Sequence, residues 1–267
     1  MKYFKKYNSN NICIDVFSGF TYEKLLPMAK EIGFDGFFSD EQSALLTDEL
    51  KKLRAEADGL GLEYETSHST IPGCTSIWSE GRAGDDYVDV LKNNIDNCSK
   101  LSIPILVVHV QVGSKNEPSF EIGINRLENV VRYAKEKSVK IAFENINSPE
   151  YLFRVLNNFN TPDVGFCYDC GHEACHTPGV RYLPEIGNRL ICTHIHDNDN
   201  KSDLHLIPFD GEIDFQQMCN ELKAINYKGN ITLELCYSDK YKAELSDYEF
   251  LKKCYESAEK IRSMIWD

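Results

Sequence analysis

The chain has 267 residues, of which 42% are hydrophobic and 27% are charged, a composition typical of globular proteins that excludes fibrous and disordered classes. Lys and Arg number 29 against 42 Asp and Glu, which gives a formal net charge of -13. Because phosphate neutralisation by basic residues supplies most of the affinity of nucleic-acid binders, this charge disfavours a nucleic acid as partner.

The chain carries no segment that indicates secretion or membrane insertion. Its start, MKYFKKYNSN, is basic, but no apolar stretch of signal-peptide length follows it. The longest apolar run, IPILVV at 103–108, is far too short to cross a bilayer. We therefore expect a cytoplasmic protein without membrane contact. The ten irregularly spaced cysteines are then expected to be reduced and mostly buried rather than paired in disulfides.

Short β-rich runs alternate with longer amphipathic segments along the whole chain. The expected strands are residues 12–18, 34–39, 62–68, 105–110, 140–146, 163–169, 190–196 and 231–237. Eight consecutive strand and helix pairs without a linker predict an α/β fold, a (β/α)8 TIM barrel formed by a single domain over residues 1–267. The weaker alternative is an open doubly wound sheet, which would normally carry a Gly-rich phosphate turn after an early strand; FSGF at 17–20 is not one.

Helices are expected at 22–33, 46–61 and 246–265, from charged and apolar residues at helical spacing. Two connections are long: 69–84, which contains Trp78, and 197–212. Either of them could be a lid or a ligand-binding loop.

Polar residues able to bind a metal stand near the carboxyl ends of six successive expected strands. They are His68, His109, Glu144, Asp169, His194 and Glu234. The carboxyl ends of all strands of a barrel meet at one face, where active sites lie. Burying so many ionisable groups there would cost several kcal/mol each without compensation, and a divalent cation is the simplest compensation. Carboxylates and imidazoles suit zinc, manganese, cobalt or magnesium in an open catalytic site.

The segment VGFCYDCGHEACHTPG at 164–179 taken alone suits a small zinc knuckle, because thiolate and imidazole are ligands that zinc prefers. On a strand, however, Cys167 and Asp169 share one face and Cys170 lies on the other, so the thiols and Asp169 cannot all converge. The resulting assignments are the barrel mouth for Asp169 and His172, barrel packing for Cys167 and Cys170, and a loop for Cys175 and His176. Of the seven histidines, His176 is the one expected to be peripheral.

Four motifs, FENINSPE (143–150), CYDCGH (167–172), THIHDNDNKSDLH (193–205) and LELC (233–236), together resemble the xylose isomerase-like barrel superfamily, and within it the sugar phosphate isomerase/epimerase group. The resemblance runs through nearly the whole chain. By similarity to ketose 3-epimerases, one divalent metal ion is expected, and its ligands would be Glu144, Asp169, His194 and Glu234.

The same resemblance implies contacts to the substrate. Glu150 and His172 match positions that touch it in the ketose 3-epimerases, whereas Asn200 replaces their arginine and Lys201 stands beside it. The further candidate substrate contacts are His68, Lys201 and Trp78. Trp78 could stack on a sugar ring or, equally, pack against the barrel.

The superfamily also contains endonuclease IV, whose three zinc ions use nine ligands, and this sequence fills all nine positions. They are His68, His109, Glu144, Asp169, His172, His194, Asp203, His205 and Glu234. A phosphodiesterase acting on abasic DNA is therefore an alternative, with up to three ions. The candidate ligands of the additional ions are His68, His109, His172, Asp203 and His205. The acidic charge of the chain weighs against a DNA substrate.

The resemblance implies a metal-dependent sugar isomerase or epimerase that acts on a ketose or related polyol through an enediolate, with Glu144 and Glu234 as catalytic carboxylates on opposite faces of the reacting carbon. Loss of a β-hydroxyl from the same enediolate would instead give a dehydratase of the inosose or dehydroshikimate type. No Gly-rich phosphate grip follows the seventh or eighth strand, which favours an unphosphorylated carbohydrate. A homodimer or a homotetramer is the expected assembly.

Overall fold

A computed structural model describes residues 10–39, 47–113 and 118–266. Eight parallel strands form one sheet in the order β7-β6-β5-β4-β3-β2-β1-β8. Their bounds are β1 Ile12–Ser18, β2 Gly36–Ser39, β3 Glu63–His68, β4 Ile105–Val110, β5 Lys140–Asn145, β6 Val164–Asp169, β7 Leu190–His194 and β8 Ile231–Cys236. The sheet curls into a barrel, and a parallel bridge from Ile195, directly after β7, to Leu233 of β8 joins its two ends.

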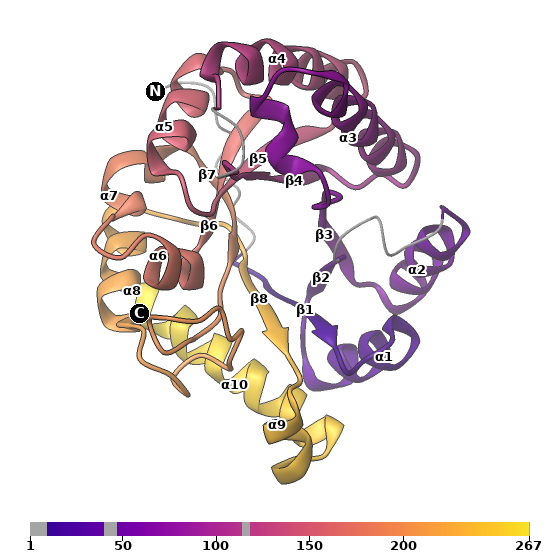
Figure 1. Cartoon of the computed structure of the whole chain (residues 1–267). Coiled ribbons are helices and arrows are strands. Elements are labelled where there is room, and N and C mark those ends of the chain that lie inside the picture. The colour runs from indigo at the N-terminus through magenta and orange to yellow at the C-terminus, as the bar shows by residue number, and fades with distance from the viewer. Residues whose placement is uncertain (1–9, 40–46, 114–117, 267) are drawn as a thin grey trace.

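Helices surround the barrel on the outside (Figure 1). Their bounds are α1 Tyr22–Ile32, α2 Thr47–Leu60, α3 Arg82–Lys100, α4 Phe120–Glu136, α5 Pro149–Asn158, α6 Cys170–His176, α7 Tyr182–Ile186, α8 Phe215–Ala224, α9 Asp239–Glu244 and α10 Asp247–Trp266, with short 3-10 helices η2 Cys74–Trp78 and η3 Gly187–Arg189. None of the helices in the described part is long and apolar enough to span a membrane.

The TIM barrel predicted from the sequence is confirmed, and each expected strand lies within two residues of an observed one. The bridge between Ile195 and Leu233 rules out the open doubly wound sheet, because the first and last strands of the curled sheet meet there. The prediction that the chain has no signal peptide used its basic N-terminal segment. Residues 1–9 of this segment lie outside the described residues.

Side chains along each strand point alternately to the helices and to the barrel axis. The hydrophobic residues therefore form two cores, one between the sheet and the helices and one inside the barrel. In β5, Ile141 and Phe143 face the helices and belong to the main hydrophobic core, whereas Ala142 and Glu144 face the barrel axis. The inward residues of the lower barrel form a small separate cluster: Ile105, Val107, Ala142, Cys167, Ile191 and Cys192. Two residues further along these strands, the same inward face carries the polar residues of the barrel mouth.

The long connection after β7 runs without helix or strand from 197 to 214, apart from one bridge between Asp197 and Leu206. The buried Asp197 organises it, because its carboxylate accepts backbone N–H bonds from Phe209, Gly211 and Ile213 at 2.8–3.1 Å. This anchoring holds the loop against the mouth of the barrel.

Candidate metal and active site

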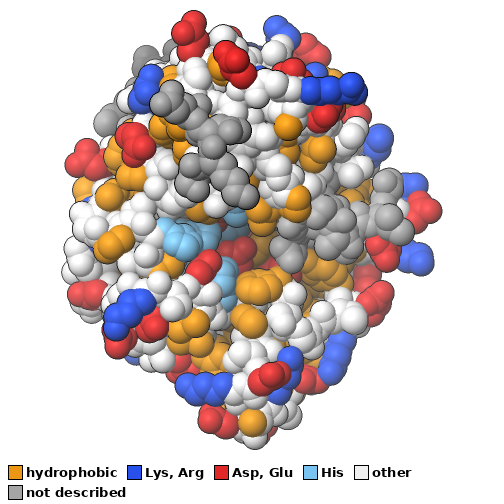
Figure 2. Space-filling view, viewed as in Figure 1, with side chains coloured by type: hydrophobic (Ala, Val, Ile, Leu, Met, Phe, Trp, Pro, Cys, Tyr) orange, Lys and Arg blue, Asp and Glu red, His pale blue; other side chains and the backbone are white. Residues whose placement is uncertain are grey.

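Four strands each place one side chain of a type suited to metal binding at the same point. Ligand atoms of Glu144 (β5), Asp169 (β6), His194 (β7) and Glu234 (β8) all lie within 4.8 Å of one another. We call these four residues the inner site. Figure 2 shows histidine side chains gathered with acidic atoms in a hollow at the centre of this face, bordered by hydrophobic side chains. The sequence predicted all four residues, and the barrel brings them together.

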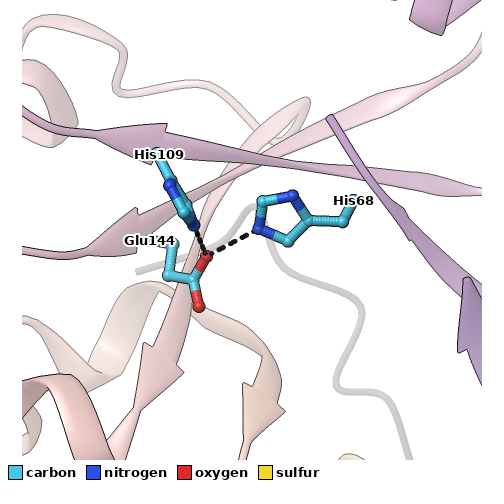
Figure 3. Close-up of side chains that lie close together, drawn as sticks. All are labelled: His68, His109 and Glu144. Carbon is cyan, nitrogen blue, oxygen red and sulfur yellow. Dashed lines mark hydrogen bonds and ion pairs between the residues drawn. The ribbon is translucent and has the colours of Figure 1, made fainter. Parts of the chain in front are cut away.

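Glu144 lies at the centre of a ring of histidines. Its Oε2 is 3.1 Å from Nε2 of His68 and 3.1 Å from Nε2 of His109, and its Oε1 is 2.9 Å from Nδ1 of His194. Figure 3 shows the rings of His68 and His109 pointing toward the Glu144 carboxylate. His68 and His109 come from β3 and β4, the strands that precede β5 in the barrel. Glu144 therefore belongs to three candidate ligand groups: one with His68 and His109, one with Cys167 and His194, and one with Asp169, His194 and Glu234.

The hydrogen bonds of His68 determine which of its ring nitrogens carries the proton. Its Nδ1 lies 2.9 Å from the carbonyl oxygen of Ser69, and a carbonyl only accepts, so Nδ1 carries the proton. In the neutral ring Nε2 is then a lone pair that faces the Oε2 of Glu144, which is also an acceptor. Two acceptors at this distance need a proton or a metal cation between them. A ring held at its other nitrogen by a backbone carbonyl is the usual arrangement of a metal-binding histidine, so these residues fit a divalent ion.

Burial raises the pKa of the carboxylates at this site, and the neighbouring histidines lower it. Burial alone would raise the pKa of Glu144, but the adjacent His194 and His109 outweigh it and hold the pKa well below 4.5. At Asp169, His172 and His196 similarly overcome burial and lower the pKa to about 2. Burial lowers the pKa of His109 to about 4, so this ring is neutral at pH 7. Ionised carboxylates and a neutral imidazole are the forms that metal binding requires.

Asp169 combines two roles at the end of β6. It is the N-cap of α6, where its Oδ1 accepts the backbone N–H of His172 at 2.6 Å. Its Oδ2 accepts a hydrogen bond from Nε2 of His196 at 3.2 Å. Both contacts hold the carboxylate in place beside the inner site. His196 was not singled out as a functional residue from the sequence, although it stands in the THIH motif.

A second group lies nearer the surface. His172, Asp203 and His205 place their ligand atoms within 4.8 Å of one another. The Nε2 atoms of His172 and His205 are 3.2 and 3.3 Å from Oδ2 of Asp203. The carboxylates around His172 outweigh burial and raise its pKa to about 10, and the two histidines hold the pKa of Asp203 well below its usual range. All nine residues of the larger predicted set thus lie in these groups.

The structure corrects the interpretation of residues 175 and 176. The sequence placed Cys175 and His176 in a loop and His176 at the periphery, but both belong to α6, because Asp169 caps a helix that begins at Cys170. The ring of His176 stacks on His172 with centroids 5.2 Å apart. His176 therefore borders the second group.

The thiols of this segment pack as predicted. Cys167 is buried in the interior barrel cluster, and Cys170 lies in the main core with its Sγ donating to the carbonyl oxygen of His196 at 3.1 Å. All ten cysteines are free, and burial raises the pKa of Cys167 and Cys170 well above the ordinary thiol value.

The candidate substrate contacts occupy different environments. Trp78 is buried, packs on Phe120 and Tyr151, and donates Nε1–H to the carbonyl oxygen of Gln111 at 2.8 Å. This placement favours the packing alternative for Trp78, since no face of the ring is open to a sugar. Glu150, in the first turn of α5, and Lys201, in the loop after β7, are both exposed.

Aromatic residues that the sequence analysis did not single out also contact the site. Phe38 of β2 stacks on His194 with centroids 4.6 Å apart. Phe17, at the end of β1, meets the ring of His205 edge-on at 4.8 Å and remains 41% exposed. Their position at strand ends is the one signal in the sequence that could have identified them.

Comparison with known proteins shows similarity in sequence and in fold. Over 192 residues, or 67% of the chain and 61% of the relative, the chain is 32% identical to the uncharacterized protein y4fM of Sinorhizobium fredii (strain NBRC 101917 / NGR234), so it spans about three fifths of that relative's length. It superposes on a D-tagatose 3-epimerase-like protein with a TM-score of 0.75 and 21% identity, covering 96% of this chain and 97% of the other.

A third similarity is to the IolI protein, solved with a bound zinc atom. The TM-score is 0.78 at 16% identity, and the superposition covers 96% of this chain and 99% of the other. The family model for the xylose isomerase-like TIM barrel matches residues 26–254. A match of this extent, on a barrel whose strand ends carry the expected donors, shows that the chain belongs to the xylose isomerase-like TIM barrel family.

Proposed function

We propose that the protein is a metal-dependent sugar isomerase or epimerase that acts on a ketose or a related polyol. The observation that carries this proposal is the inner site, where Glu144, Asp169, His194 and Glu234 bring ligand atoms within 4.8 Å of one another at the mouth of the barrel. Structural similarity to a D-tagatose 3-epimerase-like protein supports a sugar as substrate. The similarity to a zinc-containing IolI structure supports a metal.

A divalent cation held by the inner site would stabilise the negative charge that develops on the substrate oxygens when a neighbouring C–H loses its proton. The chain supplies the groups that move the proton. Two carboxylates are suited to this, one to accept a proton from carbon and one to return a proton to the same or the adjacent carbon. Return to the same carbon gives an epimer, and return to the neighbour gives an aldose or ketose isomer.

Glu144 and Glu234 have different surroundings. This difference indicates which of the two carboxylates removes the first proton. Both oxygens of Glu144 have histidine nitrogens within 3.1 Å, and these hold the pKa of Glu144 well below 4.5, so it is a weak base. For Glu234, Nδ1 of His194 is 3.5 Å away and Nδ1 of His205 is 3.8 Å away. We assign the first proton abstraction to Glu234. Glu144, which is ionised, would take a proton from an adjacent histidine and pass it on to carbon.

Solvent exchange tests the proposal. Incubation of the zinc-, manganese- or cobalt-loaded protein with ketohexoses in D2O should place deuterium at C3 of an epimerised ketose or at C1 or C2 of an isomerised one. Glu234→Gln should abolish the exchange, whereas Glu136→Gln, an exposed carboxylate on α4, should leave it unchanged. Absence of exchange across a panel of ketoses and metals would contradict the proposal, and release of water with an unsaturated or deoxy product would indicate the dehydratase alternative.

A second candidate function has one specific observation in its favour. The groups His68–His109–Glu144 and His172–Asp203–His205 flank the inner site, and this is the arrangement expected for a multi-zinc phosphodiesterase. Chelator-sensitive nicking of duplex DNA at an abasic site, without any exchange into ketoses, would establish that activity. The net charge of -13 weighs against it, because a DNA duplex is a polyanion.

A further inference from the structure

Two asparagines at the end of β5 hold it to the segments on both sides by the same kind of contact. Asn145 donates Nδ2–H to the carbonyl oxygen of Asp169 at 2.8 Å and accepts the backbone N–H of Asp169 at 2.9 Å. Asn147 pairs in the same way with both backbone groups of Val112, which follows β4, at 3.2 and 3.1 Å. A side-chain amide offers a donor and an acceptor, as a peptide group does, so each asparagine can pair with a backbone.

The contact of Asn145 takes over where the backbone pairing of β5 with β6 ends. The last paired residues in the register of these strands are Glu144 and Cys167. Two residues beyond Cys167, the backbone of Asp169 meets the side chain of Asn145 instead. Both residues are 0% exposed. Since buried backbone groups need hydrogen-bond partners, the amide of Asn145 satisfies a requirement that water cannot meet here.

This pair controls the direction of the Asp169 carboxylate. The N–H and C=O groups of one residue belong to the two peptide planes that flank its Cα, so fixing both groups restricts φ and ψ of that residue. At Asp169, φ is -102° and ψ is 115°, the extended values at which β6 ends and the cap of α6 begins. The Cα that is held in this way carries a candidate metal ligand. Asn145 therefore restricts where this carboxylate points.

Asn145 also links two carboxylates of the inner site. Glu144 directly precedes it in the chain, and ligand atoms of Glu144 and Asp169 lie within 4.8 Å of one another. Two carboxylates that are buried at such a separation repel each other strongly, because little water screens them. The carbonyl oxygen of Asn145 also accepts Nδ1–H of His172 at 3.0 Å, which ties α6 to the same point. The contacts of Asn145 thus oppose the separation of the two carboxylates.

We propose that Asn145 is a positioning residue that preorganises the inner site, because it holds Glu144 and Asp169 together before a divalent cation binds. Preorganised ligands bind more tightly, since less ordering remains to be done on binding. The inference rests on the proposed function in one respect, that the inner site holds the ion, and its test needs no substrate. Asn147 provides a matched control, because it makes the same pair with Val112, which is not a candidate ligand.

The first measurement uses the metal-free full chain. Hydrogen exchange of backbone amides is followed by NMR in the wild type, Asn145→Ala and Asn147→Ala after treatment with a chelator. The amide of Asp169 should exchange roughly 5-fold faster or more in Asn145→Ala, the effect of one lost hydrogen bond. It should keep the wild-type rate in Asn147→Ala. A wild-type rate at Asp169 in Asn145→Ala would show that the pair does not hold this backbone, and the inference would fail.

The second measurement is zinc affinity, by competition with a chromophoric chelator. Asn145→Ala should bind Zn2+ roughly 10- to 100-fold more weakly, the loss typical of a group that orients a metal ligand. Asn147→Ala should bind it as the wild type does. Asn145→Ser is a second variant, whose short side chain leaves room for a water beside the Asp169 backbone, and its affinity should fall as well.

The spectrum of Co2+ separates positioning from a general loss of stability. At one equivalent of Co2+, the visible absorption of both Asn145 variants should differ from that of the wild type, because the ligands are arranged differently, and Asn147→Ala should reproduce the wild-type bands. Wild-type zinc affinity in both Asn145 variants would contradict the inference. So would an equal loss of affinity in Asn145→Ala and Asn147→Ala.

The outcomes also distinguish this inference from the proposed reaction. A wild type that binds no zinc would overturn both the inference and the metal dependence of the reaction. Zinc binding that is strong in the wild type and weakened in Asn145→Ala, without deuterium exchange into any ketose, would support the inference and overturn the reaction alone.

Discussion

Gly171 and His196 occupy adjoining space so closely that a side chain at residue 171 is excluded: a Cβ there would lie 1.8 Å from Cε1 of the imidazole. This contact allows His196 to donate Nε2–H to Asp169 at 3.2 Å. The glycine of the CGH motif is therefore explained by a ring that approaches from the segment directly after β7, and the position of Asp169, a candidate metal ligand, depends on it.

Gly171→Ala should weaken inner-site metal binding. The added methyl group displaces His196, and loss of an outer-shell partner of a ligand typically costs roughly 10- to 100-fold in metal affinity. Competition with a chromophoric chelator measures the affinity, and circular dichroism checks the fold. The matched control is Gly59→Ala in α2, where a Cβ meets nothing within 4 Å. Unchanged zinc affinity in Gly171→Ala would show that His196 does not position Asp169.

Removal of metal should lower the melting temperature. An ion that binds the native state alone stabilises it by about 2.7 kcal/mol at 100 times its dissociation constant. For a domain of roughly this size, each kcal/mol corresponds to about 2–4 °C. A chelator should therefore lower Tm by several degrees, and Asp169→Asn, which keeps an N-cap residue but loses an anionic ligand, should show a smaller decrease. An identical Tm with and without chelator would contradict metal binding by the native protein.

Stability should fall as pH rises because of Glu65, a buried carboxyl on β3. Burial raises its pKa from 4.5 to about 8, although Thr232 donates a hydrogen bond to Oε2 at 2.6 Å. Between these two values the unfolded chain loses a proton that the folded protein keeps. The free energy of unfolding should therefore decrease by up to about 1.4 kcal/mol per pH unit in this window, and level off above it.

Glu65→Gln removes this titration while keeping the size of the side chain. Denaturant titrations of the wild type and the variant from pH 5 to pH 9 should diverge, with the variant gaining relative stability as pH rises. Parallel pH profiles would mean that Glu65 is already ionised in the folded protein at neutral pH.

Trp78→Phe should reduce stability and leave substrate affinity intact. The variant loses the hydrogen bond to Gln111 and leaves a cavity beside Gly123, where the indole packs so closely that a Cβ would lie 2.0 Å from it. We expect a loss of about 1–3 kcal/mol, from an unpaired carbonyl and the lost volume. Trp266→Phe, which also loses an indole bond but is less buried, should lose less. A raised KM with unchanged stability in Trp78→Phe would instead indicate a stacking role.

Much of the inner site could be predicted from local sequence. Glu144, Asp169 and Glu234 each follow an apolar run whose alternation shows which residues face inward. The carboxyl ends of parallel barrel strands meet at one face, so donors at these ends had to meet as well. The same reasoning gave the correct packing of Cys167.

The error at His176 arose beyond β6, whose end at Asp169 matches the expected strand 163–169. A loop was expected there, but Asp169 is an N-cap, and a helix starting at Cys170 places His172 and His176 on one face. The aspartate before a Cys-Gly-His-Glu run was the available signal, because Asp is among the favoured helix N-caps.

Local periodicity was enough to specify the barrel and the donors at its mouth, because strand alternation and strand ends are properties of short segments. The tertiary structure decided which nitrogen of each ring faces the cluster. His172 and His205 donate Nδ1–H to carbonyl oxygens of β5 and β8, strands to which neither belongs. Those acceptors come into reach only when the barrel closes, so the ring nitrogen that each histidine presents to Asp203 is a product of the fold.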